Sequence, residues 1–258
     1  MQKESEGSPL ESVDRALRLV ILLREHGPLS VTAAAEHLGV APSTAHRLLS
    51  ALSFRGFAVQ DRNRPYRPGP QLADATASPL SRAALTRLVR PALDRLRQET
   101  DESAHLAVLS GPEILFIDGI ESERALRVGL RTGVRIPAYC TSAGRAMLAA
   151  LPGGEVDQVY RAGLPPWRGS HLTTMTGLRR QLSIVRKQGY ALNQEESEQG
   201  VVAVGTCLVD REGRPVAGMS VSIPSARFRR SRLPDYVAAV RAASAQAQRR
   251  VDESTAAG

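Results

Sequence analysis

The sequence has little cysteine and no long hydrophobic run. Its two cysteines, Cys140 and Cys207, are far apart and form no Cys-x-x-Cys pair. This excludes a disulfide scaffold and a zinc knuckle, and it suits a reducing cytoplasm. No apolar stretch approaches the roughly 20 residues that a membrane span requires, and the polar N-terminus lacks the apolar core of a signal peptide. We therefore expect a cytoplasmic protein that contacts no membrane.

Lysine is also nearly absent, since Lys3 and Lys187 are the only lysines among the 34 basic residues. The net charge of +8 and the pI of about 10.3 permit a polyanionic partner. The planar fork of arginine suits phosphates and guanine edges. A genome rich in G and C, which favours arginine codons, explains the bias at least as well. Composition alone therefore leaves a nucleic-acid partner open.

Motifs of enzymes and metal sites are missing as well. There is no Gly-x-Ser-x-Gly elbow and no His-Glu-x-x-His pair. Cys140 and Ser142 are candidate nucleophiles and His105 and His171 candidate bases, yet no spacing brings them together. One acidic loop offers metal ligands, but we favour a solvated loop; it contains Glu195, Glu196 and Glu198. We therefore expect that the protein is not an enzyme and that it binds no metal and no cofactor.

What the sequence contains is a run of short helices over residues 12–69, after a leader at 1–11 that we expect to be disordered. Apolar spacings of three and four predict helices over 12–26, 31–38 and 42–55. Caps and breakers set these bounds: Ser12, Gly27–Pro28, Ser30, Gly39 and Pro42. A charged turn between Val59 and Tyr66 then predicts a β-hairpin. Together these elements are typical of a winged helix-turn-helix.

The third helix is the candidate recognition helix. Its apolar residues fall within about 100° of a helical wheel, and its other face is short, polar and cationic, as close approach to base edges requires. The candidate DNA-binding residues on that face are Ser43, Thr44, His46, Arg47 and Ser50. An ordinary surface helix has a polar face too, so the helix alone does not decide the function.

The hairpin adds support for DNA. Four arginines and a single acid, Asp61, lie between Arg55 and Arg67. Arg62 and Arg64 at its turn are further candidate DNA-binding residues, because a basic wing can reach along the backbone or into the minor groove. Two alternatives remain open: a solvated turn, and a winged helix that serves only as a protein-interaction module.

The rest of the chain predicts an α+β domain. Residues 70–100 are mostly helical, with interruptions at Pro79 and Pro91. We expect a linker helix over 70–90 and an effector-binding and oligomerisation domain over 91–252. Strands are predicted over 106–109, 114–117, 201–209 and 216–223, and helices over 142–151, 178–188 and 234–251. Without regular βαβ alternation, the sheet should be antiparallel.

At this point the chain resembles the IclR-type bacterial transcriptional regulators. The resemblance rests on several blocks in order, among them SVDRALRLVILL, GPLSVTAAAEHLGVAPSTAHRLLSALSFRGF, RVGLRTGVRIPAYCTSAGRAMLA and RKQGYALNQEESEQGVVAVGTCLVDREGRPVAGMSVSIP. It covers residues 12 to 250. It implies a homodimer or a dimer of dimers on a partly palindromic operator, and a GAF-like C-terminal domain that holds a small carboxylate effector.

The resemblance also implies the residues of the effector site, which are Val128, Ser142, Ala143, Asn193, Ala203, Ser220 and Ser222. The helix that begins near Ser142 offers free N–H groups that suit a carboxylate. Ser220 and Ser222 are two apart on a strand, so both hydroxyls face the same side. The alternative for the serines is a solvent-facing strand surface.

Two positions depart from the family pattern. Some members have an aspartate where this chain has Asn193, and a cysteine where it has Ala203. We therefore expect an effector that differs from small keto acids. The sequence as a whole predicts a DNA-binding transcriptional regulator, repressor or activator, whose operator binding responds to an organic acid.

Overall fold

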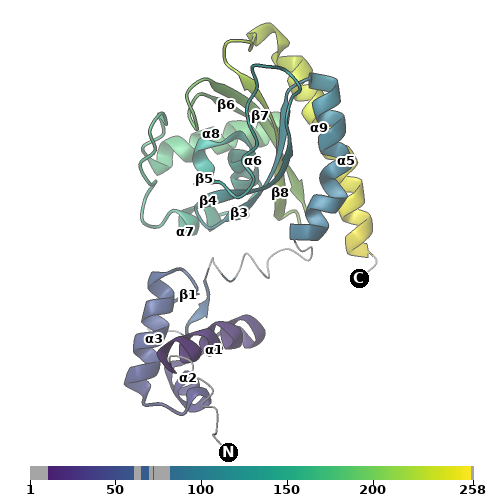
Figure 1. Cartoon of the computed structure of the whole chain (residues 1–258). Helices are drawn as coiled ribbons and strands as arrows, with labels where there is room; N and C mark the ends of the chain where they lie inside the picture. The colour runs from purple at the N-terminus through teal and green to yellow at the C-terminus, as the bar shows by residue number, and fades with distance from the viewer. Residues whose placement is uncertain (1–10, 61–64, 70–71, 73–81, 257–258) are drawn as a thin grey trace, which may run out of the picture. The chain divides into compact units, whose positions relative to one another are not determined.

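The computed structural model describes residues 11–60, 65–69, 72 and 82–256. The chain divides into two units, residues 1–77 and 78–258 (Figure 1). The first contains three described helices and a two-stranded sheet: α1 (Glu11–His26), α2 (Val31–Leu38), α3 (Pro42–Phe54), β1 (Ala58–Val59) and β2 (Arg67–Pro68). This order confirms the predicted winged helix-turn-helix.

Local capping explains the bounds of the short helices. The Ser30 hydroxyl accepts a hydrogen bond from the Ala33 amide at 3.1 Å and begins α2. Gly39 ends α2 with φ 64°, a left-handed conformation that a glycine adopts without strain. One expected cap is wrong: α1 begins at Glu11, so Ser12 lies inside its first turn. The expected leader lies outside the described residues, apart from Glu11.

The second unit is a six-stranded antiparallel sheet with helices on both faces. Its strand order is β5-β4-β3-β8-β7-β6. The strands are β3 (Ser103–Ser110), β4 (Glu113–Ile120), β5 (Arg135–Pro137), β6 (Ala191–Gln194), β7 (Val201–Val209) and β8 (Pro215–Pro224). The helices are α5 (Arg82–Thr100), η1 (Ala138–Cys140), α6 (Ser142–Ala150), α7 (Glu155–Val159), α8 (Met175–Gln188), η2 (Arg230–Arg232) and α9 (Leu233–Ala256). The predicted α+β class is confirmed.

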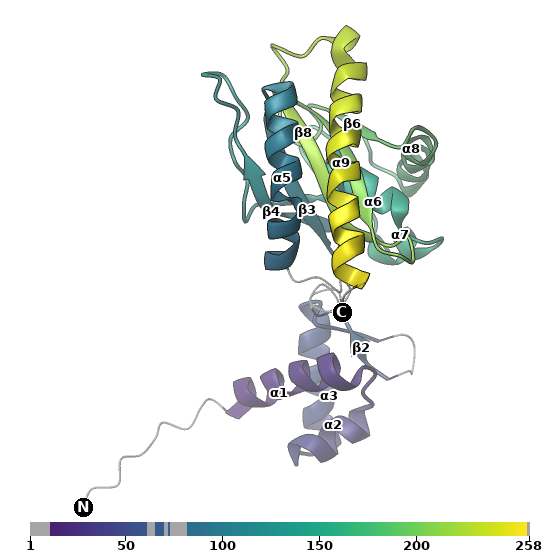
Figure 2. The same ribbon diagram turned by 90° about the vertical axis from the view of Figure 1, so that its right-hand side faces the viewer.

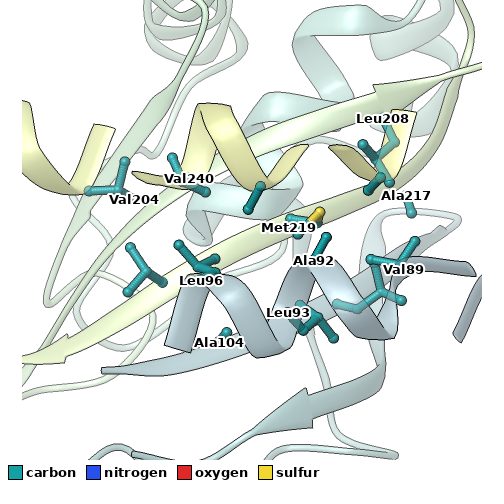
Figure 3. Close-up of a cluster of buried hydrophobic side chains, with 14 of the residues drawn as sticks. Val89, Ala92, Leu93, Leu96, Ala104, Val204, Leu208, Ala217, Met219 and Val240 are labelled. Atoms are coloured by element: carbon teal, nitrogen blue, oxygen red, sulfur yellow. The ribbon is translucent and has the colours of Figure 1, made fainter. Parts of the chain in front are cut away.

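One face of this sheet is aliphatic and is covered by α5 and α9, which lie side by side (Figure 2). Leu93 and Leu96 of α5 and Val240 of α9 pack on Met219 of β8, and all four are fully buried (Figure 3). Burying each such side chain contributes about 1.5–3 kcal/mol. This layer is the main core of the unit.

Helix α5 differs from its prediction. It runs through Pro91 without a break and crosses the boundary that the sequence analysis placed between residues 90 and 91. Leu85 and Val89, on the N-terminal side of the proline, belong to the same core as Leu93. Their packing compensates for the one backbone hydrogen bond that a proline removes. Among the described residues, every helix is too short or too polar to span a bilayer.

The opposite face of the sheet carries α6, which approaches unusually closely because glycines lie beneath it. A Cβ added at Gly205 would lie 2.6 Å from the Ala143 amide nitrogen, and one at Gly218 would lie 2.9 Å from the Ala143 Cβ and carbonyl oxygen. Met147, one turn along α6, also lies over Gly218. Helix α6 therefore begins above Gly205 and runs away from the Ala203 end of β7.

This contact predicts that Gly205→Ala destabilises the second unit. The new methyl group meets backbone atoms of α6, so the helix must shift, at a cost of about 1–3 kcal/mol. Urea unfolding followed by the fluorescence of Trp167, the single tryptophan, measures the change. Gly153→Ala is the matched control, because a Cβ there meets nothing within 4 Å. Equal stability of the two variants would contradict the account.

Candidate DNA-binding surface and effector site

The predicted recognition helix, α3, presents its polar face to solvent. Ser43, His46, Arg47 and Ser50 are exposed and Thr44 is half-buried. The opposite face buries Ala45, Leu49 and Leu52 in the core of the first unit. The amphipathic face inferred from the sequence is therefore the face that the structure leaves open.

The N-terminus of α3 is also open. Pro42 occupies the first turn and the preceding Ala41 supplies no side-chain cap, and no acid lies in that turn. The positive end of the helix dipole is thus uncompensated by these groups, which is the arrangement that binds phosphate oxygens. The end of the helix and the cationic face beside it both suit a nucleic-acid backbone.

Tyr66 holds the base of the wing against α3. Its backbone exchanges hydrogen bonds of 2.7 and 2.9 Å with Leu29, and its buried ring lies edge-on to His46 at 6.5 Å. Its hydroxyl lies 3.4 Å from the Ser50 hydroxyl. The wing and the recognition helix are therefore joined directly. Arg62 and Arg64 lie outside the described residues.

In the second unit, a row of four residues crosses the sheet on the face that carries α6. The register pairs Ser103 with Ser222, Ser222 with Ala203, and Ala203 with Asn193. We call these four residues the polar row. The next row contains His105, Ser220 and Gly205. All side chains of both rows are buried, so the alternative of a solvent-facing strand for the two serines is wrong.

The start of α6 lies next to these rows. Thr141 caps the helix by accepting a hydrogen bond from the Gly144 amide at 3.0 Å. The amides of Ser142 and Ala143 have no hydrogen-bond partner in the described part of the chain. Two free N–H groups at the positive end of a helix suit a carboxylate. Six of the seven expected effector residues are therefore gathered here: Ser142 and Ala143 begin α6, and Asn193, Ala203, Ser220 and Ser222 face it from three strands.

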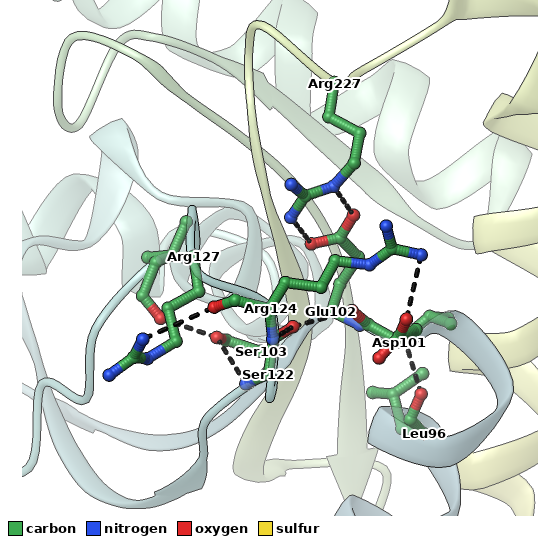
Figure 4. A network of polar contacts seen from close by, with 10 residues as sticks. Leu96, Asp101, Glu102, Ser103, Ser122, Arg124, Arg127 and Arg227 are labelled. Carbon is green, nitrogen blue, oxygen red and sulfur yellow. Dashed lines mark hydrogen bonds and ion pairs between the residues drawn. The ribbon is translucent and has the colours of Figure 1, made fainter.

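Residues 121–134, which we call the strap, lie against the other end of the rows. The Ser103 hydroxyl donates to the Val128 carbonyl at 2.5 Å and accepts from the Ser122 amide at 3.0 Å (Figure 4). The His105 Nε2 lies 3.2 Å from the Gly129 carbonyl. Val128 is the one expected effector residue that lies outside the strands and α6. It contacts the polar row through its backbone carbonyl.

Burial lowers the pKa of His105 to about 4, and the positive charge of Arg131 on the strap lowers it as well. The hydrogen bond to Gly129 and the charge of Glu121 act in the opposite direction but are weaker. The imidazole also lies edge-on to Phe116, with ring centroids 5.6 Å apart. His105 is therefore neutral in the folded chain at neutral pH.

The acidic loop is partly exposed, as the sequence analysis favoured, but two of its three glutamates form ion pairs with arginines. Glu196 pairs with Arg145, whose buried guanidinium also donates to the Tyr139 carbonyl at 2.7 Å. Glu198 pairs with Arg131 of the strap at 2.6 Å. Burial lowers the pKa of Arg145 to about 10. The loop is held by two arginines, and no cluster of three potential metal ligands occurs among the described residues.

The structure gives the candidate nucleophiles and bases of the sequence analysis separate roles. Burial raises the pKa of the Cys140 thiol, so it is not an activated nucleophile. Its carbonyl accepts a hydrogen bond from the Asn193 amide. His105 bonds to Ser222 and the strap, while His171 is exposed. Among the described residues, no hydrogen bond joins Cys140 or Ser142, the candidate nucleophiles, to either histidine.

A cleft of about 380 Å³ lies elsewhere, among residues of α6, α8, β7 and α9. Arg186, Arg241 and Thr206 are among its lining residues, and none of the seven expected effector residues is. Arg186 donates to the Ala149 carbonyl and Arg241 to the Gln188 carbonyl, so both arginines close the C-terminal ends of helices. We therefore place the candidate site at the polar row and not at this cleft.

Sequence reasoning missed three residues of these sites. Tyr66 was taken only as a strand residue, although it joins the wing to α3. Ser103 and His105 lie directly beside Ser222 and Ser220, but only the strand register reveals this. The available signal was the alternation Ser103-x-His105 directly before the strand predicted over 106–109, which in the structure begins at Ser103.

The fold is that of a winged helix-turn-helix followed by a second unit, an antiparallel sheet with helices on both faces. Residues 12–62 match the model of the IclR helix-turn-helix domain, and residues 77–249 match that of the bacterial transcriptional regulator IclR C-terminal domain. The chain belongs to the IclR family of bacterial transcriptional regulators.

Individual relatives agree with this assignment. The chain is 31% identical to the HTH-type transcriptional regulator BhcR of Paracoccus denitrificans, over 87% of this chain and 81% of that protein. It is similar to the crystal structure of Thermotoga maritima IclR, with 26% identity, a TM-score of 0.62, and coverage of 94% and 99%. An IclR homologue from Microbacterium hydrocarbonoxydans, complexed with 4-hydroxybenzoate, has the same fold at 21% identity, a TM-score of 0.59, and coverage of 93% and 98%. The first relative is a regulator and not an enzyme, in line with the expectation from the sequence.

His105 generates a prediction about pH. Its folded pKa of about 4 lies below the ordinary 6.5, so the unfolded chain binds the proton more readily between these values. Stability is therefore full above about pH 6.5 and falls as the pH falls toward 4, with about 2 kcal/mol lost by pH 5. Urea unfolding at pH 8 and pH 5, followed by Trp167 fluorescence, measures the loss.

His105→Gln is the control for this experiment, because an amide can still donate to the Gly129 carbonyl but does not titrate. We expect the loss between pH 8 and pH 5 to shrink by about 2 kcal/mol in this variant. An undiminished loss would show that other groups cause it.

Proposed function

We propose that the chain is a sequence-specific transcriptional regulator whose affinity for its operator changes when a small organic acid binds at the polar row. The observation that carries the proposal is the convergence of buried polar groups, Ser222 and Asn193 among them, on two free amides at the start of α6. Buried polar groups without full partners are costly in a site that serves only packing. The recognition helix in the same chain binds the operator, and its affinity for DNA is what the acid changes.

Charge supports an acid as the ligand. The amides of Ser142 and Ala143 and the dipole of α6 favour a negative group. The nearby Glu196 is paired with Arg145 and so adds little repulsion. The homologue from Microbacterium hydrocarbonoxydans binds 4-hydroxybenzoate, which is such an acid.

The departures at Asn193 and Ala203 bear on which acid binds. A neutral amide in place of a carboxylate removes a negative charge, and an alanine in place of a cysteine leaves more room. Both changes favour an effector other than the small keto acids, with greater bulk or different polarity.

We further propose that the regulator acts in the cytoplasm as a homodimer or a dimer of dimers. Helix α1 carries an exposed apolar stripe, Val13, Leu17 and Ile21, at spacings of four. A second copy of the chain would cover such a stripe and present two recognition helices to half-sites one helical turn apart or a multiple of it. The alternative function, a winged helix that contacts only proteins, makes no use of the cationic face of α3.

Arg47 tests the proposal. Genome-wide mapping of bound DNA identifies an operator, and gel retardation then measures affinity against salt. Arg47→Ala should weaken operator binding by about 1–3 kcal/mol, because an exposed arginine on the recognition helix contacts bases or phosphates. Replacing Arg62 and Arg64 should weaken all sequences equally and reduce the salt slope.

Arg249→Ala is the matched control, since it removes one exposed arginine from α9, in the other unit. It should leave the affinity unchanged. Operator binding that survives Arg47→Ala would show that α3 is not the recognition helix. A protein that retards no DNA in a salt-dependent way would support the protein-interaction alternative.

A further inference from the structure

The hydrogen bonds of the polar row determine which groups still face a ligand as donors and which as acceptors. A carbonyl oxygen can only accept, so the contact between His105 Nε2 and the Gly129 carbonyl, at 3.2 Å, places a hydrogen on Nε2. Because the imidazole is neutral, its Nδ1 then carries no hydrogen. Nδ1 is an acceptor.

Ser222 is the partner of that acceptor. Its hydroxyl oxygen lies 3.3 Å from His105 Nδ1, so the hydroxyl hydrogen is donated to the ring. The oxygen of Ser222 therefore offers only lone pairs to any other group. The strap thus sets the polarity of Ser222 through two consecutive hydrogen bonds: His105 Nε2 donates to the Gly129 carbonyl, and the Ser222 hydroxyl donates to His105 Nδ1.

The two outer members of the row have the same polarity. Ser103 donates its hydrogen to the Val128 carbonyl at 2.5 Å and accepts from the Ser122 amide. Asn193 donates through Nδ2 to the Cys140 carbonyl. Its Oδ1 is buried without a hydrogen-bond partner among the described residues. An unpartnered buried acceptor costs about 1–3 kcal/mol until a donor reaches it.

Ala203 lies between these acceptors. The register places it directly between Asn193 on β6 and Ser222 on β8, on the same face. Because neighbouring strands are about 4.8 Å apart, the two acceptor residues lie roughly two strand spacings apart, with the methyl group of Ala203 between them. A ligand atom that lies over Ala203 therefore meets lone pairs on both sides.

We propose that the effector is a hydroxy acid, whose hydroxyl group donates a hydrogen bond to Asn193 or Ser222 over Ala203 while its carboxylate faces the start of α6. This inference rests on the proposed function and adds the chemistry of the second end of the ligand. A neutral hydroxyl fits better than an ammonium group, because a buried cation needs a carboxylate and the nearby Glu196 is already paired with Arg145. A ligand carbonyl at this end would place its own lone pairs against those of Asn193 and Ser222, with no hydrogen between them.

The tautomer of His105 tests the polarity without any ligand. Nitrogen-15 NMR of the full-length protein, labelled in histidine, should show a neutral ring with hydrogen on Nε2 and a bare Nδ1. A hydrogen on Nδ1 would overturn the inference, because Ser222 would then accept from the ring and keep its own hydrogen for the ligand. This outcome would leave the proposed function intact.

Matched acids test the ligand class. Calorimetry on the full chain should compare two series: glycolate, acetate and methoxyacetate, and 4-hydroxybenzoate, benzoate and 4-methoxybenzoate. In a series that binds, the hydroxy acid should bind at least about tenfold more tightly than the other two members, because only it donates a hydrogen bond to the buried acceptors. Equal or tighter binding of the unsubstituted acid or the ether would overturn the inference while leaving an acid effector in place.

Variants connect this preference to the row. Ser222→Ala should bring the ratio of the affinity for the hydroxy acid to that for the unsubstituted acid toward one. Asn193→Leu is a second variant in case Ser222→Ala does not fold. Ser244→Ala is the matched control, a buried serine on α9, and it should keep the ratio. An unchanged ratio in both row variants would overturn the assignment of the ligand hydroxyl to this place.

If neither series binds, nor any other carboxylic acid in a thermal-shift panel of matched hydroxy and unsubstituted acids, the proposed function and this inference fail together.

Discussion

The close approach of α6 to the sheet is the constraint on which the second unit depends. Gly205 and Gly218 offer no Cβ, and only for that reason can the helix begin directly on the strands. This contact places the free amides of Ser142 and Ala143 beside the polar row. The opposite face of the sheet needs no such device, because α5 and α9 pack on it through aliphatic side chains. One face of the sheet thus packs only on aliphatic side chains, and the other carries both a second core and the proposed effector site.

Burial would make the proposed site selective. In a site shielded from water, each polar group must find a partner or lose stabilisation, and the strap provides carbonyl partners for Ser103 and His105. Those partners orient hydrogens away from the ligand. The strap is itself tied to the acidic loop by Arg131 and Glu198. At the ends of the two central strands, Glu102 and Arg227 are joined by two hydrogen bonds of 2.6 Å, which connect the start of β3 to the segment before α9 (Figure 4). A ligand at the proposed site would therefore act on groups that are already joined to one another.

Much of this architecture could be predicted from the sequence, and the limits have physical causes. Helix periods, the Ser30 cap and the Gly39 turn are local signals, so the winged helix and its polar face were predictable. The paired strands around Gly111 and Gly213 follow from turn residues. The continuity of α5 through Pro91 depends on tertiary packing, which overrides the local effect of proline. The neighbours of Ser222 depend on strand register between distant segments, which periodicity does not contain.

The central claim is that one ligand site in the second unit changes the affinity of the first unit for DNA. Thermodynamic linkage requires the effect to be reciprocal. The most direct measurement is the affinity of the effector acid for the free protein and for the protein saturated with operator DNA. We predict affinities that differ by the same factor, about 5–150-fold, by which the acid changes operator affinity. Equal affinities in the two states, with operator binding unaffected by the acid, would contradict the account.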